Sequence, residues 1–100
     1  MRSSPNGDQL FQLEISAAIA EALRQLQRRA SREGRGKAFL LALRKMVDRL
    51  RSDPSEFGEP LYRLSGLRMQ IRCAVIRPLG VYFGVCEDRP LVFIKSVKLL

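Results

Sequence analysis

The sequence predicts an α+β fold in which an N-terminal strand precedes an antiparallel two-helix hairpin packed on one face of a mainly antiparallel four- to five-stranded sheet. Three observations support this class. Apolar and polar residues alternate near the N-terminus, two segments with helical hydrophobic spacing follow, and the second half alternates strand-like segments with short turns. The 100 residues suffice for one core. We expect a flexible leader in residues 1–9 and a single domain in residues 10–100.

The first strand is predicted at Leu10–Ile15, where apolar and polar side chains alternate as in a strand with one buried face. Ser16 suits the N-cap of a helix, because its hydroxyl can accept a hydrogen bond from an unpaired amide of the first turn. The helix is expected to continue to about Arg32, with hydrophobic residues at helical spacing. Gly34 and Gly36 then mark its end and a tight turn.

The second helix is predicted from about Lys37 to Arg51. Asp53 precedes Pro54, and a proline disfavours helical geometry in the residue before it, so the helix ends there. The short connection between the two helices favours an antiparallel hairpin. The hydrophobic residues expected to pack this hairpin onto the sheet are Ile19, Leu23, Leu26, Leu40, Leu43, Val47 and Leu50, and their expected partners on the sheet are Met69, Ile71 and Val75.

The remaining strands are predicted at Leu61–Leu64, Arg68–Ile76, Val81–Cys86 and Leu91–Val97, and the last three are joined by connections of hairpin length. Within the Arg68–Ile76 strand, apolar residues alternate with a polar row. The polar row consists of Arg68, Gln70 and Arg72. We assign this row to the solvent face of the sheet.

The composition indicates an anionic partner. The net charge is +8 and the isoelectric point is near 10.5, which is typical of proteins that bind nucleic acid, anionic lipid or acidic proteins. No apolar segment approaches the roughly 18 residues that span a bilayer, and the N-terminus lacks the apolar region of a secretory signal. Two cysteines fit a reducing compartment. We expect a cytoplasmic protein without membrane association.

The basic residues of the strands and turns are candidates for nucleic-acid binding, because clustered arginine and lysine neutralise phosphates and release counterions. These candidates are Arg63, Arg68, Arg72, Arg77, Lys95 and Lys98. An alternative stays open, in which these charges only keep the sheet soluble. A second basic cluster lies around the hairpin turn and consists of Arg28, Arg29, Arg32, Arg35 and Lys37. These cations suit helix ends, where the dipole stabilises them, and a partner or nucleic acid is the alternative.

Several kinds of chemistry find no support in the sequence. There is no histidine and no CxxC motif, so we expect no metal site, no cofactor and no histidine-based acid–base catalysis. Cys73 and Cys86 are expected to be small buried hydrophobic residues, and Tyr62 and Tyr82 to pack on the sheet. Catalysis would rest on electrostatic stabilisation by basic side chains. The candidates for this role are Arg63, Arg68, Arg72, Arg77 and Lys95.

The element order, the size and the pattern DP…LYRL…IR…VYFGV…LVFIKSV resemble the RelE/ParE-type toxin superfamily of toxin–antitoxin modules. The resemblance covers the chain from about residue 10 onward and lies in architecture and pattern. It implies a toxin that an antitoxin protein wraps and inhibits. The RelE branch cleaves messenger RNA on the ribosome and the ParE branch inhibits DNA gyrase, so the resemblance implies one of these targets.

The family's functional residues are only partly matched. The family's arginine at the start of the VYFGV-type strand falls at about Gly80, with Arg77 nearest, and the sequence reaches Leu100 without the family's C-terminal catalytic Tyr or His. The resemblance therefore leaves an RNA-cleaving toxin, a gyrase-binding toxin and a degenerate relative as interpretations. The alternative from another class is a non-catalytic basic module that docks an acidic protein or nucleic acid.

Overall fold

The computed structural model describes residues 10–100, and the predicted leader, residues 1–9, lies outside the described residues. The elements in chain order are β1 (Gln12–Glu14), α2 (Ala17–Arg32), α3 (Gly36–Ser52), β2 (Glu59–Leu64), a short 3₁₀ helix η1 (Ser65–Leu67), β3 (Met69–Ile76), β4 (Leu79–Cys86) and β5 (Leu91–Leu99). The predicted element order is confirmed. The strands differ from the prediction mainly at their ends. For example, β4 begins two residues earlier than predicted, so only two residues separate it from β3.

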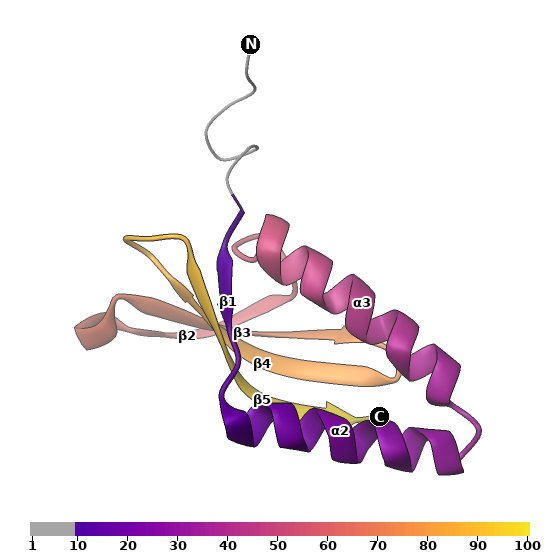
Figure 1. The fold of residues 1–100 in the computed structure, drawn as a ribbon. Coiled ribbons are helices and arrows are strands. Elements are labelled where there is room, and N and C mark those ends of the chain that lie inside the picture. The colour runs from indigo at the N-terminus through magenta and orange to yellow at the C-terminus, as the bar shows by residue number, and fades with distance from the viewer. Residues whose placement is uncertain (1–9) are drawn as a thin grey trace.

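The five strands form one mixed sheet in the order β1-β5-β4-β3-β2. β1 pairs with β5 in parallel, whereas all other neighbours are antiparallel. Both helices lie on one side of the sheet, and the β2–β3 and β4–β5 hairpins extend beyond the helices at one end (Figure 1). This is the predicted α+β architecture.

Local signals position the two helices as expected. Ser16 Oγ accepts a hydrogen bond from the Ile19 amide at 3.1 Å, so Ser16 is the N-cap of α2. Gly34 adopts a positive φ of 76° directly after the helix, which glycine does at little cost. α3 then begins at Gly36, after the turn that reverses the chain direction.

The hairpin packs on the opposite face of β3 from the one predicted. The core joins buried hydrophobic residues of the helices to one face of the sheet. It contains Ala30, Phe39, Ala42, Met46 and Leu50 from the helices, Phe57 from the loop, and Ala74, Leu79, Val81, Phe83, Val85, Val92 and Ile94 from the sheet. Met69, Ile71 and Val75 face away from the helices, so that part of the prediction is wrong. Leu40, also predicted to be in the contact, is exposed.

β4 provides the physical reason for this orientation. Its large side chains at 79, 81, 83 and 85 alternate with Gly80, Tyr82, Gly84 and Cys86, and only the first set can fill the space beneath two helices. In the antiparallel register, Arg72 is opposite Phe83 and Ala74 is opposite Val81. Residues that pair directly share a face, so Gln70 and Arg72 of the polar row turn toward the helices.

Candidate functional site

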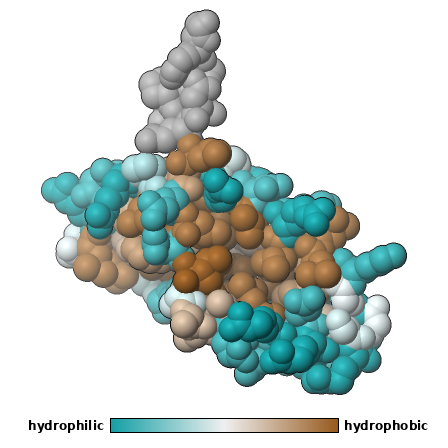
Figure 2. All heavy atoms as spheres, viewed as in Figure 1, coloured by the Kyte–Doolittle hydropathy of each residue, from teal (hydrophilic) through white to brown (hydrophobic). Residues whose placement is uncertain are grey.

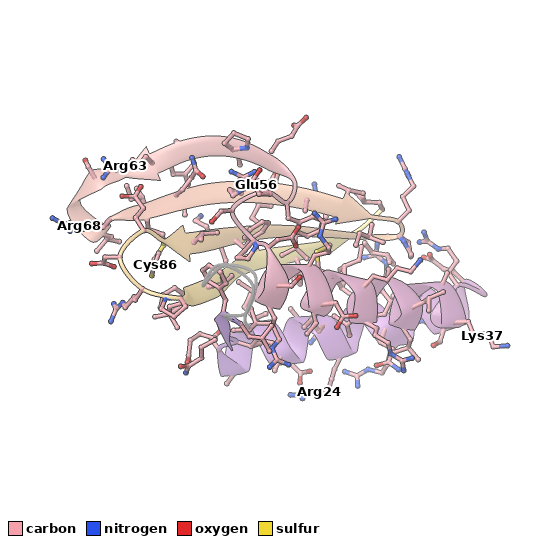
Figure 3. All side chains as sticks on the ribbon, turned by 90° about the horizontal axis from the view of Figure 1, so that it is seen from above. Arg24, Lys37, Glu56, Arg63, Arg68 and Cys86 are labelled. Atoms are coloured by element: carbon pink, nitrogen blue, oxygen red, sulfur yellow. The ribbon has the colours of Figure 1, made fainter. Side chains whose placement is uncertain are left out.

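The predicted basic residues are spread along the sheet and its turns, and Lys95 and Lys98 are exposed in β5. Arg63 and Arg68 lie at one end of the molecule, opposite the hairpin turn marked by Lys37 (Figure 3). Arg77 lies in the β3–β4 turn at the other end of β3 from Arg68. Nine steps of extended chain at about 3.3 Å each place Arg68 and Arg77 about 30 Å apart. These side chains cannot surround a single phosphate.

Arg72, a predicted nucleic-acid contact, is buried, with 7% of its surface exposed. Its Nε donates to the Phe57 carbonyl at 2.9 Å and its Nη2 donates to the Gly58 carbonyl at 3.2 Å. Its Nη1 donates to Gln70 Oε1 at 2.9 Å. The prediction that Arg72 faces solvent is therefore wrong, because the loop before β2 supplies carbonyl partners beneath the helices. Arg72 fixes that loop to the sheet.

The same loop is anchored by aromatic contacts. The Phe57 ring stacks on Phe83 with centroids 6.0 Å apart. The guanidinium of Arg49 lies 4.4 Å from the centre of the Phe57 ring. Arg49 also pairs with Asp53 at 2.8 Å, and its hydrogen bond lowers the pKa of that carboxyl group. The loop between α3 and β2 is thus held from the helix side and from the sheet side.

Arg63 is engaged in an ion pair with Glu87. Its Nε and Nη2 donate to the two carboxylate oxygens of Glu87 at 2.5 and 2.7 Å. This hydrogen-bonded pairing lowers the pKa of Glu87, and the nearby charge of Arg68 contributes further. The positive charge at this end of the sheet is therefore partly balanced within the protein.

The excess positive charge lies on the helical hairpin rather than on the sheet. Residues 17–52 contain ten arginines and lysines and three acidic residues, which gives a net charge of +7. Residues 53–100 contain seven basic and five acidic residues, which gives +2. The helical hairpin, whose basic cluster the sequence also indicated, therefore carries more net charge than the sheet.

The sheet face turned away from the helices, called the open face below, carries an apolar row across four strands. Tyr62 of β2 pairs with Ile71, Ile71 with Gly84, and Gly84 with Phe93. A Cβ at Gly84 would lie 2.4 Å from Met69 Sδ, so Met69 occupies the space that this glycine leaves. Around the row, 49% of Tyr62, 55% of Val75 and 36% of Phe93 remain exposed. The sequence prediction missed this face because it placed Met69, Ile71 and Val75 under the helices.

A second apolar surface lies between the helices. Figure 2 shows hydrophobic residues gathered in the space between α2 and α3 of Figure 1, with hydrophilic residues around them. On the α3 side this surface includes a shallow groove lined by Leu40, Leu43, Arg44, Val47 and Asp48. Leu41, next to it, is 54% exposed. We call this surface the hairpin groove.

An open cleft of about 630 Å³ lies at the β4–β5 end of the sheet. Its lining consists of Phe11, Ser55, Gln70, Val85, Cys86, Glu87, Asp88, Arg89 and Pro90. Cys86 is buried here and Cys73 is partly buried, and both are free thiols. No histidine is present to activate either thiol. Within residues 10–100, no three potential ligand side chains are grouped to hold a metal ion. The cleft therefore contains no thiol paired with a histidine and, among residues 10–100, no group of metal ligands.

No protein-family model, curated protein or solved structure matches this chain. Among the described residues, no helix has the length and apolar character needed to cross a membrane. Function is therefore inferred from the arrangement of the surfaces described above.

Proposed function

We propose that this chain is the toxin component of a cytoplasmic toxin–antitoxin module, similar to the RelE/ParE type or a degenerate relative, and that it acts by binding a protein target. The observation that carries the proposal is the architecture. A short N-terminal strand, then a helical hairpin on one face of the sheet, then four further strands agree with the element order that the resemblance implies. A gyrase-like target fits this proposal better than RNA.

Binding is favoured over cleavage because the arginines of the sheet are not gathered at one place. Arg72 is buried, Arg63 pairs with Glu87, and Arg77 lies at the opposite end of β3. Stabilising a cleaved phosphodiester requires several donors within hydrogen-bond distance of one group. The open face instead presents tyrosine, phenylalanine and aliphatic side chains, which are typical anchors of protein interfaces.

The hairpin groove suits the inhibitory partner. Its lining contains Arg44 and one acidic residue, Asp48, and Lys37 lies in an adjoining depression at the start of α3. A groove of this kind accepts the apolar side of an amphipathic helix, and the bordering cations favour a partner with acidic residues. We infer that a small acidic antitoxin helix binds here.

Controlled expression in bacteria tests the proposal. We expect induction to stop growth, and co-expression of the cognate antitoxin to restore it. Mapping of transcript ends in the arrested cells should reveal no new cleavage sites, because the toxin binds a protein. New cleavage sites in many messages would instead identify a ribonuclease. Normal growth with verified soluble protein would contradict a toxin and favour the non-catalytic interaction module.

A further inference from the structure

The exposed side of α2 is unusually rich in arginine. Arg24, Arg28, Arg29 and Arg32 accompany a single acidic residue, Glu21, within the 16 residues of the helix. Arg24, Arg28 and Arg32 are four residues apart, so they form one row about 12 Å long at 1.5 Å rise per residue. Arg24 points away from the sheet (Figure 3).

These arginines also border a shallow depression. It is lined by Gln25, Leu26, Arg28, Arg29 and Arg32 and has a volume of about 320 Å³. Three guanidinium groups and one amide thus surround one site on the outer surface of the helix. Such a site supplies many hydrogen-bond donors in fixed planar geometry, which matches phosphate oxygens.

The acidic neighbours neutralise this surface only weakly. Glu21 contacts Arg24 at 2.9 Å and Arg28 at 3.4 Å, and Glu33 contacts Arg29 at 3.7 Å. All of these side chains are roughly half exposed, and such ion pairs contribute little to stability. An incoming phosphate can therefore replace a carboxylate as the partner of these arginines at small cost.

The composition of the surface distinguishes among anionic partners. None of the large exposed hydrophobic residues of the described chain lies in α2. A membrane-bound helix needs such residues to enter the lipid, and a protein interface needs them for its core. A phosphodiester backbone needs only the cations. We propose that the outer face of α2 binds the phosphate backbone of a nucleic acid without regard to sequence, in addition to the protein contacts of the open face.

Fluorescence anisotropy with labelled RNA and DNA duplexes of equal sequence and length tests the proposal and separates the two sources of phosphate. Over about 0.05 to 0.3 M salt, log K should fall linearly with log salt, with a slope of about −0.9 for each phosphate neutralised. The variant Arg28→Ala/Arg29→Ala/Arg32→Ala should reduce the magnitude of the slope by about 2 to 3 units and weaken binding at least tenfold at about 0.1 M salt.

A matched control removes the same charge elsewhere. Arg63→Ala/Arg68→Ala/Arg89→Ala acts at the β2–β3 and β4–β5 end and should bind almost as the unchanged protein does. Circular dichroism verifies that both variants are folded. Equal weakening by the two variants, or affinity independent of salt, would overturn the proposal. The proposal would also be overturned if the α2 arginines were needed for binding to phosphatidylserine vesicles or polyglutamate while the protein did not bind the duplexes. The assay has no growth readout, so its result is independent of the proposed toxin activity.

Discussion

Gly58→Ala is expected to lower the free energy of unfolding by about 3 kcal/mol or more, a severe loss for the addition of one methyl group. Gly58 has a positive φ of 71°, which disfavours any side chain. A Cβ at this position would also lie 2.1 Å from the Cys73 carbonyl oxygen and 2.9 Å from the Ala74 Cβ. Backbone atoms of a paired strand cannot move aside, so the loop must leave the sheet.

Gly34→Ala is the control that measures the cost of a positive φ alone. Gly34 has a similar φ of 76°, but a Cβ added to it would have no atom within 4 Å. Its replacement should cost only about 1 kcal/mol, the conformational penalty alone. Urea unfolding measures both variants under identical conditions. Equal destabilisation of the two would show that the close approach of Gly58 to β3 does not contribute.

Arg72→Ala is expected to destabilise the protein by about 2 to 4 kcal/mol, because it removes the donor to the buried Phe57 carbonyl and to the partly buried Gly58 carbonyl and opens a cavity. The removal of a buried charge offsets part of this loss. Arg72→Lys should recover only part of the stability, since an ammonium group cannot reproduce the forked guanidinium contacts.

Substitution of the neighbouring Arg68 serves as the control for an arginine on the surface. Arg68 is exposed, and Arg68→Ala should change the unfolding free energy by less than about 0.5 kcal/mol. The urea midpoint of each variant is the quantity to compare, with the m-value checked for two-state behaviour. If Arg72→Ala shifts the urea midpoint no more than Arg68→Ala does, the buried contacts of Arg72 are contradicted.

The fold class followed from short-range signals. Ser16 caps α2, Gly34 ends the same helix, and the alternation in β3 correctly indicated a strand. The face of β3 that packs on the helices could not be predicted from these signals. Alternation of polar and apolar residues separates the two faces of a strand but does not show which face is covered. An arginine normally marks the exposed face. Here Arg72 is covered because carbonyls of a loop about fifteen residues earlier satisfy it, and periodicity contains no information on such a contact.

The candidate sites were predicted less well, for a related reason. The total charge suggested a basic surface, and the sequence prediction named both the strands and the hairpin turn as candidate places for it. Ten of the basic residues lie in the hairpin, and the open face is apolar at its centre. The glycines of β4 contain the missing signal: Gly80 and Gly84 share a face with Tyr82, so the other face of β4, with Phe83, must carry the core.

The proposal that the open face binds a protein target is tested most directly by the growth of bacteria that express Tyr82→Ala/Phe93→Ala. Both rings are more than one-third exposed, so the variant should stay folded. Aromatic anchors at the centre of an interface contribute about 2 kcal/mol or more each. We predict that this variant no longer stops growth, whereas Leu41→Ala/Leu67→Ala, which removes two exposed hydrophobic side chains elsewhere, stops growth as the unchanged toxin does. Undiminished growth arrest by the folded Tyr82→Ala/Phe93→Ala variant would contradict the account.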